Sequence, residues 1–136
     1  MVQVERLLKQ AKQASQRAYA PYSQLKVGAA LLTKTGECFL GCNVENSSFG
    51  ATICAERVAI CNAVSQGFTN FAALAIVNDS DKIITPCGIC RQFLREFTQD
   101  VEIYCGNDKL KYKKYTLKQL FPDEFTLDQV KKKSEN

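Results

Sequence analysis

Apolar residues recur along this chain with two spacings, one typical of helices and the other typical of strands. Between residues 4 and 19 they return every three or four positions, which places them on one face of a helix that Pro21 would end. Two later segments share this spacing, and Gly67 follows one of them while Pro86 precedes the other. The pattern predicts helices over residues 4–19, 54–66 and 87–97.

Shorter apolar segments bounded by turn residues are typical of strands. Two of them flank Lys34-Thr35-Gly36, which suits a hairpin turn, so this pair should be antiparallel. The later segments alternate with predicted helices, an order that favours a mixed sheet covered by helices. We predict a layered α/β sandwich with five strands, over residues 25–33, 37–44, 71–77, 101–105 and 110–115.

The chain has 136 residues, of which 46% are hydrophobic, and this is the size and composition of one globular domain. We expect a single domain over residues 1–136, with residues 129–136 as a flexible tail. The longest apolar runs are of strand length, far below the roughly 20 residues that cross a bilayer. The N-terminal residues lack the features of a signal peptide. We therefore expect a cytoplasmic protein that has no membrane partner.

Positive charge exceeds negative charge only modestly, with 18 Lys and Arg residues against 14 Asp and Glu residues. Part of the excess lies in the three lysines at positions 131–133, near the C-terminus. A nucleic-acid-binding protein usually concentrates basic residues on one face or along one helix. We therefore expect no nucleic acid partner.

Seven cysteines and the absence of histidine narrow the possible chemistry. The cysteine count is odd, and a reducing compartment does not preserve structural disulfides, which favours metal or redox chemistry. Without histidine there can be no Ser-His-Asp triad, no Cys-His nucleophile and no histidine metal ligand. Any catalysis must rely on carboxylates, thiolates or a metal ion.

Three of the cysteines, Cys54, Cys87 and Cys90, lie at the predicted N-terminal ends of two helices. A helix N-terminus carries a partial positive charge, which stabilises the thiolate that a metal requires. Residues three apart share a helix face, so Cys87 and Cys90 can meet one ion. Three protein ligands leave the fourth position of zinc open for water, as in catalytic sites. Glu56 follows Cys54 closely and is the candidate for moving protons.

Three thiolates around one dication leave a net negative centre, which would weaken zinc as a Lewis acid. Two arginines lie close to the ligands in the sequence, Arg57 after Cys54 and Arg91 after Cys90. We expect these two guanidinium groups to draw negative charge back from the sulfur atoms.

Five short motifs accompany these residues. They read Pro-Tyr-Ser at 21–23, Val-Gly-Ala-Ala-Leu at 27–31, Gly-Cys-Asn-Val-Glu-Asn at 41–46, Ile-Cys-Ala-Glu-Arg at 53–57 and Thr-Pro-Cys-Gly-Ile-Cys-Arg-Gln at 85–92. In this order they resemble the motifs of the small zinc-dependent cytidine deaminases, whose signature pairs zinc ligands with a glutamate that is not a ligand. The resemblance spans residues 5 to about 128. Each motif would be weak alone, but five in register identify the family.

The resemblance implies a three-layer α/β/α fold with zinc held by Cys54, Cys87 and Cys90, and with Glu56 as the proton shuttle. The implied reaction is hydrolytic deamination of cytidine and deoxycytidine to uridine and deoxyuridine with release of ammonia, a step of pyrimidine salvage. A small nucleoside is therefore the expected substrate. The members of the family with three cysteine ligands are homotetramers, which is the assembly that we expect here.

Four further positions match residues of the family that contact the substrate. The resemblance implies that Asn43 and Glu45 bind the ribose 3′-hydroxyl, and an amide beside a carboxylate suits that role. It implies that the backbone of Ala55 faces the carbonyl group of the base. The backbone carbonyl of Thr85 would meet the departing ammonia.

Three further positions complete the comparison with the family, and two of them depart from its usual residues. Phe125 lies in a segment that, in the family, carries an aromatic ring into the site of a neighbouring subunit. Leu25 replaces the usual phenylalanine, so a stacking ring is lost while an apolar wall remains. Phe49 stands where tyrosine is common, and one hydroxyl group is lost there.

Alternative interpretations remain at this point. Cys87-Gly88-Ile89-Cys90 at a helix start also suits a thioredoxin-like dithiol. A structural zinc site in a binding module would need a fourth cysteine, and Cys42, Cys61 or Cys105 could supply it. We expect these three and Cys38 to be buried in the packing instead. A deaminase acting on a cytosine nucleoside antibiotic is a further alternative.

Overall fold

The computed structural model describes residues 2–130, which form one five-stranded sheet and its helices. The strands are β1 (Val27–Thr33), β2 (Cys38–Cys42), β3 (Phe71–Asn78), β4 (Glu102–Gly106) and β5 (Tyr112–Thr116). Their order is β2-β1-β3-β4-β5, in which β3 and β4 are parallel and the other neighbours are antiparallel. The helices are α1 (Val4–Ser15), α2 (Ala55–Ser65), α3 (Gly88–Phe97) and α4 (Leu117–Leu120), with 3-10 turns η1 (Phe49–Ala51) and η2 (Leu127–Gln129). The predicted mixed sheet is confirmed, and residues 131–136 of the predicted tail lie outside the described residues.

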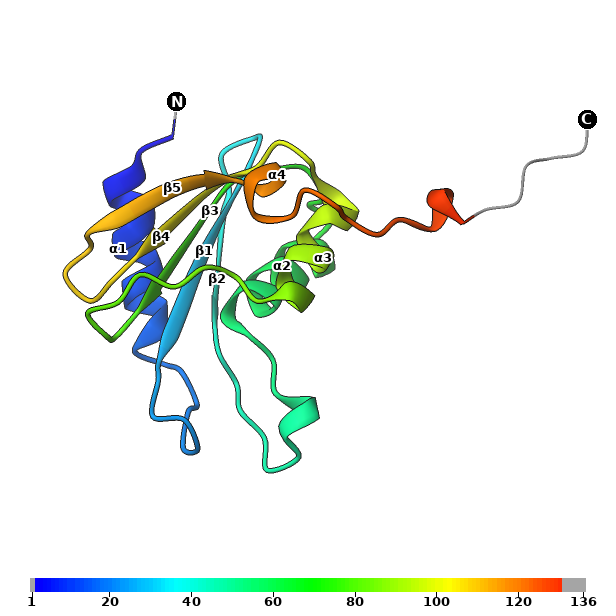
Figure 1. Cartoon of the computed structure of the whole chain (residues 1–136). Coiled ribbons are helices and arrows are strands. Elements are labelled where there is room, and N and C mark those ends of the chain that lie inside the picture. The colour runs from blue at the N-terminus through cyan, green and yellow to red at the C-terminus, as the bar shows by residue number, and fades with distance from the viewer. Residues whose placement is uncertain (1, 131–136) are drawn as a thin grey trace, which may run out of the picture.

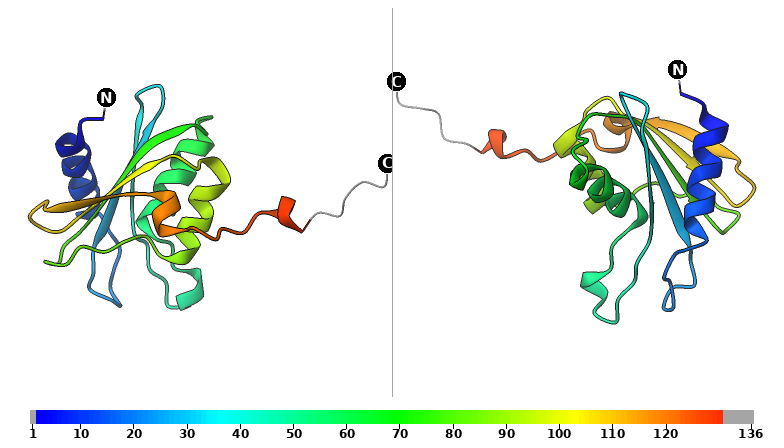
Figure 2. Two further views of the ribbon diagram at one scale, coloured as in Figure 1. Left: turned by 45° about the horizontal axis from the view of Figure 1, so that its top comes forward. Right: turned by 180° about the vertical axis from the view of Figure 1, so that it is seen from behind.

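Helices cover both faces of the sheet, so the predicted three-layer α/β/α sandwich is confirmed (Figures 1 and 2). α1 packs on one face, where the smaller core includes Leu8 and Tyr104. α2 and α3 pack on the other face, over the larger core that includes Phe71 and Ile103. The central strand β3 is almost entirely buried, as expected for a strand covered on both faces. Among residues 2–130, no helix is long and apolar enough to cross a membrane.

Two glycines allow helix backbones to lie unusually close to the sheet. On one face, a Cβ atom added to Gly28 would lie 1.9 Å from the carbonyl oxygen of Ala11 in α1. On the other face, a Cβ atom added to Gly41 would lie 2.4 Å from both the carbonyl oxygen of Ala55 and the nitrogen of Ala59. The missing side chain of Gly41 therefore sets the distance between β2 and the first turn of α2.

The first helix ends at Ser15, earlier than the predicted residue 19, because the chain beyond it pairs with a distant segment. The backbone N–H of Tyr19 donates to the carbonyl oxygen of Asn43 at 3.0 Å, and the N–H of Glu45 donates back to the carbonyl oxygen of Tyr19 at 2.9 Å. This long-range pairing prevails over the helical spacing of the sequence. It also brings residues 19–26 beside the segment that follows β2.

Candidate metal centre

The three cysteines predicted to hold a metal ion come together where α2 and α3 begin. Cys54 is the N-cap residue of α2, Cys87 is the N-cap residue of α3, and Cys90 lies in the first turn of α3. Their sulfur atoms all lie within 4.8 Å of one another. Both helix N-termini direct their partial positive charge toward these sulfurs. One ion can therefore contact all three side chains.

The distances between the sulfur atoms suit zinc. Zn–S bonds of about 2.3 Å in a tetrahedral site place two sulfurs about 3.8 Å apart, and the Sγ atoms of Cys54 and Cys87 are 3.7 Å apart. No fourth Cys, Asp or Glu within residues 2–130 joins the group. The alternative of a closed structural zinc site needs a fourth protein ligand, and the described residues do not supply one. An ion held here keeps one position for water or substrate.

Glu56 lies in the first turn of α2 and is only 4% exposed. Burial raises the pKa of its carboxyl group to about 7, and the nearby Cys54 thiolate also raises it. A group with a pKa close to neutrality can both accept and release a proton at the operating pH of an enzyme. The burial of Glu56 therefore suits the proton-transfer role proposed for it.

The cysteines themselves differ in their tendency to ionise. A hydrogen bond from Cys90 lowers the pKa of Cys54 to about 5, and Arg57 contributes to the lowering. The same hydrogen bond, together with burial, raises the pKa of Cys90. Cys54 therefore ionises more readily than Cys90.

Arg57, which was predicted to draw charge from sulfur, contacts one of the three cysteines directly. Its Nη2 atom lies 3.7 Å from Cys54 Sγ and 3.4 Å from the carbonyl oxygen of Thr52. Its Nε atom is buried and has no hydrogen-bond partner among the described residues. The guanidinium group is therefore held against a sulfur atom, where its positive charge favours the thiolate.

Arg91, for which the same role was predicted, directs its hydrogen bonds elsewhere. Its Nε atom donates to the carbonyl oxygen of Pro86 at 2.7 Å, and its Nη2 atom donates to Thr85 Oγ1 at 2.9 Å. Its Nη1 atom donates to the carbonyl oxygen of Leu120. All three acceptors are neutral oxygens, so Arg91 holds the segment before Cys87 rather than a ligand sulfur.

Asn43, predicted to bind ribose, is buried and forms two hydrogen bonds with the start of β1. Its Oδ1 atom accepts a hydrogen bond from the N–H of Val27 at 2.9 Å, and its Nδ2 atom donates to the carbonyl oxygen of Leu25 at 2.9 Å. Leu25 itself is half-buried. The amide therefore fixes the backbone from Leu25, the residue that replaces the usual phenylalanine, to Val27.

Glu45, the second predicted ribose ligand, holds the preceding loop. Its Oε1 atom accepts hydrogen bonds from the N–H groups of Tyr22 and Ser23, each at 3.0 Å, and its Oε2 atom accepts one from the Ser23 hydroxyl. The hydroxyl bond is the main reason why the pKa of Glu45 is lowered. This network was missed at the sequence level. The only signal for it in the sequence is the Pro-Tyr-Ser motif.

Ala55 and Thr85 lie on either side of the cysteines. Ala55 is fully buried at the start of α2, where backbone N–H groups have no acceptor within the helix. Thr85 is half-buried and lies two residues before Cys87. Both backbones therefore border the metal-binding group.

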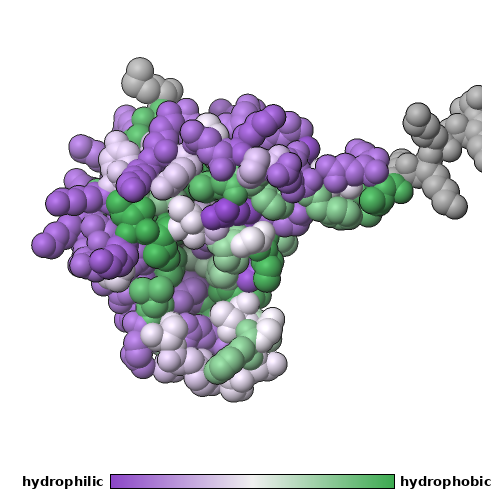
Figure 3. Space-filling model, in the orientation of Figure 1, coloured by the Kyte–Doolittle hydropathy of each residue, from purple (hydrophilic) through white to green (hydrophobic). Residues whose placement is uncertain are grey.

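Phe125 lies on the segment of residues 121–130, here called the arm, which extends away from the layered body (Figure 1). Its ring is half exposed, and its carbonyl oxygen accepts a hydrogen bond from Gln92 Nε2 at 2.8 Å, on the middle of α3. Phe49, at 75% exposed, and Leu127, at 74% exposed, add apolar surface. Figure 3 shows hydrophobic surface both on the arm and around η1.

The four remaining cysteines do not join the metal-binding group and are free thiols. Cys105 is buried, and Cys38 and Cys42 are half-buried, in line with a packing role. The expectation for Cys61 was wrong, because this residue is exposed. The buried face of α2 is formed by Ala55, Glu56, Ala59, Ile60 and Ala63, which leaves Cys61 on the other side of the helix.

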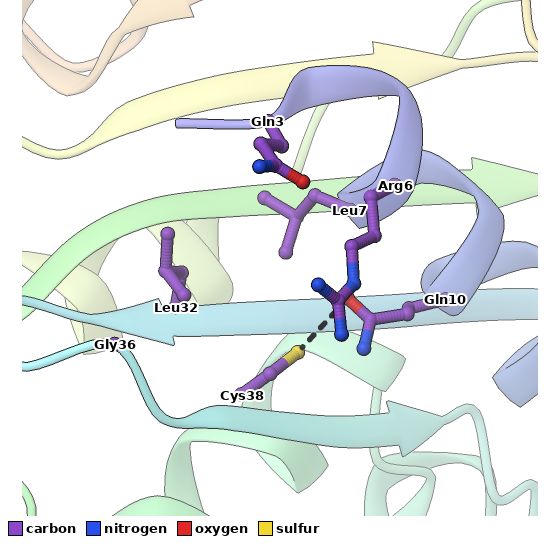
Figure 4. Close-up of a pocket in the computed structure, with 7 residues that line it drawn as sticks. All are labelled: Gln3, Arg6, Leu7, Gln10, Leu32, Gly36 and Cys38. Atoms are coloured by element: carbon purple, nitrogen blue, oxygen red, sulfur yellow. Dashed lines mark hydrogen bonds between the residues drawn. The ribbon is translucent and has the colours of Figure 1, made fainter. Parts of the chain in front are cut away.

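A separate cavity of about 260 Å³ lies on the opposite face of the sheet, between α1 and the β1–β2 hairpin (Figure 4). It is lined by Arg6, Gln10 and Cys38, and Cys38 Sγ donates a hydrogen bond to Gln10 Oε1 at 3.5 Å. Burial raises the pKa of Cys38, so its thiol stays protonated and is a poor nucleophile or metal ligand. The reactive groups are therefore concentrated at the start of α2 and α3.

Residues 1–106 match the family described as "Cytidine and deoxycytidylate deaminase zinc-binding region". A cytidine deaminase of Sporosarcina psychrophila is 42% identical over 128 residues, which cover 93% of this chain and 94% of the relative. A probable cytidine deaminase of Dictyostelium discoideum is 44% identical over 135 residues, covering 98% and 90% of the two chains. More distantly, a blasticidin-S deaminase of Bacillus cereus is 34% identical over 109 residues, covering 74% and 76%.

The fold agrees with these matches. The crystal structure of a cytidine deaminase from Burkholderia pseudomallei superposes with a TM-score of 0.87 at 42% identity, covering 92% of this chain and 100% of the other. The thioredoxin-like alternative is wrong, because the thiols of Cys87 and Cys90 share one centre with Cys54 from a second helix. On the evidence of its sequence, its fold and its three-cysteine centre, the chain belongs to the zinc-binding cytidine and deoxycytidylate deaminase family.

Proposed function

We propose that this zinc-dependent deaminase acts on free cytidine and deoxycytidine, converting them to uridine and deoxyuridine with release of ammonia. The observation that carries the proposal is the buried carboxyl group of Glu56 beside three converging cysteines. Bound zinc would supply a water activated near neutral pH. Glu56 would accept a proton from this water, pass it to the ring nitrogen and then assist the departure of ammonia.

The remaining site residues would hold the nucleoside in place. Asn43 retains one amide N–H and one lone pair beyond its two backbone bonds, which it would offer with Glu45 to the ribose 3′-hydroxyl. The free N–H at the start of α2 supports the proposed contact of the Ala55 backbone with the base carbonyl. The carbonyl of Thr85 would accept a hydrogen bond from the leaving ammonia. Leu25 would form an apolar wall beside the ring.

The direct test follows loss of the amino chromophore when purified protein with one zinc per chain is mixed with cytidine. Turnover is expected, and its absence in a zinc-loaded sample would reject the substrate assignment. Glu56→Gln should retain zinc but lose turnover, since an amide cannot shuttle protons. Glu5→Gln, at an exposed glutamate in α1 on the opposite face, is the matched control and should keep full activity.

We further propose a homotetramer in which Phe125 of one chain reaches the site of a neighbour, and a cytoplasmic role in pyrimidine salvage as a single-domain protein. The arm extends away from the layered body (Figure 2) and leaves Phe125 half exposed, which supports use by another chain. Sedimentation of the purified protein tests the assembly, and a monomer at working concentration would reject it.

A deaminase of a nucleoside antibiotic is the second candidate, favoured by the match to blasticidin-S deaminase. The cytidine deaminases match more of this chain with higher identity, which is why we prefer cytidine. Parallel assays with cytidine and blasticidin S distinguish the two. Faster turnover of the antibiotic would reverse the preference.

A further inference from the structure

One face of α3 holds the arm and its base by three side chains. Arg91 donates to the carbonyl oxygen of Leu120, and Gln92 Nε2 donates to the carbonyl oxygen of Phe125 at 2.8 Å. Arg95 Nε forms an ion pair with Glu124 Oε1 at 3.1 Å, and both side chains are half-buried. The helix that supplies two metal ligands at its N-terminus therefore also docks the C-terminal segment.

Of these three side chains, only Arg91 also forms hydrogen bonds with the segment before Cys87, here called the ligand segment. Its bonds to Pro86 and Thr85 fix the residues that lead into Cys87. Pro86 is buried, whereas Cys87 is exposed, so the position of Cys87 depends on the segment before it rather than on packing around its own side chain. The backbone N–H of Arg91 donates to the carbonyl oxygen of Cys87 at 3.0 Å, which closes the first turn of α3.

The acceptors of Arg91 explain why an arginine is needed. A planar guanidinium group presents several donors in fixed directions, so it can bind three oxygens from separate segments at once. Lysine would keep the charge but has a single flexible ammonium group. Within residues 2–130 no carboxylate forms an ion pair with Arg91, so its three bonds to neutral oxygens are its structural function.

We propose that Arg91 is a positioning residue that sets Cys87 for zinc binding and couples this ligand to the base of the arm at Leu120. Loss of its directed hydrogen bonds would loosen the Thr85-Pro86 segment and α4 together. Groups that orient a metal ligand from outside the coordination sphere typically change metal affinity by about 10-fold to 100-fold when mutated. The proposal rests on zinc ligation and is independent of which nucleoside is the substrate.

The test compares Arg91→Lys and Thr85→Val with Arg95→Gln in the zinc-loaded full-length protein. Thr85→Val removes one acceptor of Arg91 with little change in shape, and Arg95→Gln removes the arm ion pair without touching the ligand segment. Competition with a zinc chelator should show roughly 10-fold weaker zinc binding for Arg91→Lys, a smaller loss for Thr85→Val and unchanged binding for Arg95→Gln. Cobalt(II)-substituted Arg91→Lys should show altered visible bands, because these bands report the geometry of the ligands.

Hydrogen exchange tests the coupling. Arg91→Lys should speed exchange in both residues 85–91 and 117–121, whereas Arg95→Gln should affect the arm alone. Wild-type zinc affinity and cobalt bands in Arg91→Lys would overturn the proposal. Equal zinc loss in Arg95→Gln would also overturn it, because the effect would then be a general loosening of α3. None of these readouts uses cytidine, so a failure of the proposed substrate would leave the result interpretable.

Discussion

Asn43 and Glu45 illustrate how a polar side chain can serve the fold and remain available for a ligand. Asn43 accepts one hydrogen bond from the backbone of Val27 and donates one to the backbone of Leu25. Glu45 accepts three hydrogen bonds from Tyr22 and Ser23. An amide and a carboxylate both have capacity beyond these bonds. At the scale of single residues, the proposed ribose ligands are therefore oriented by their neighbours before any substrate arrives.

The lowered pKa of Glu45 leads to a pH prediction. The group's ionised form is stabilised by hydrogen bonds in the folded protein, so its contribution to stability is complete above the usual value of 4.5 and is lost as the pH falls through the lowered pKa. Amide NMR signals of Tyr22 and Ser23 should therefore shift together in this acidic range. In Glu45→Gln the shift should disappear, and its persistence would assign the titration to another group.

The contact of Arg57 with Cys54 leads to a second residue-level prediction. Removing a positive charge beside a ligand sulfur leaves more negative charge on the metal centre, which disfavours loss of a proton there. Arg57→Gln should therefore move the acidic limb of the pH–rate profile to higher pH. Arg6→Gln, on the opposite face of the sheet (Figure 4), is the control. Superimposable profiles for Arg57→Gln and wild type would contradict the role.

At the scale of elements, the site depends on where two helices begin. In the sequence, Gly67 marks the end of one helix and Pro86 marks the start of the other, which is why the predicted helices over 54–66 and 87–97 agree closely with α2 and α3. The short helix α4 and the turns η1 and η2 were not predicted, because each is only one turn long and carries no periodic signal. The early end of α1 was missed because its cause, the pairing of Tyr19 with the chain around Val44, is not local.

Gly41 provides the element-level prediction. In Gly41→Ala the new methyl group would meet the backbone of Ala55 and Ala59 at 2.4 Å, so α2 must move away from β2. We expect a loss of about 1–3 kcal/mol in the free energy of unfolding and weaker zinc binding, because Cys54 and Glu56 move with α2. Thermal unfolding and chelator competition measure the two effects.

The matched control for this change is Gly50→Ala, where nothing lies within 4 Å of the added methyl group. It should leave both stability and zinc affinity close to the wild-type values. If Gly41→Ala also retained wild-type zinc affinity, the position of α2 would not depend on the close approach to β2.

At the scale of the whole molecule, the arm is the feature that a single chain does not explain. It presents apolar residues to solvent, among them Phe125 at 50% exposed and Leu127 at 74% exposed, and a large contiguous apolar patch on a protein surface typically marks an interaction site. Close to its base at Leu120, the arm is nevertheless tied to α3 by the Arg95–Glu124 pair. A fixed base with an exposed tip suits a segment that docks on another subunit.

Subunit mixing tests this view. If each site combines Glu56 of one chain with Phe125 of another, Glu56→Gln and Phe125→Ala should each lose activity, whereas co-refolded mixtures of the two should regain part of it. Recovery follows because some sites then receive both wild-type residues from different chains. Activity that stays at the sum of the separate variants would show that each site is built from one chain.

The sequence by itself determined the α/β class, the candidate zinc ligands and the candidate proton shuttle, because these depend on local periodicity and on cysteine spacing at helix starts. It also excluded histidine chemistry. Only the tertiary structure decided how the arginines divide their roles, with Arg57 against Cys54 and Arg91 bound to the chain before Cys87. Likewise, only the fold placed Glu45 on the Tyr22-Ser23 backbone. Such contacts join segments distant in sequence, and the direction of a long side chain is set by the acceptors that folding brings within reach.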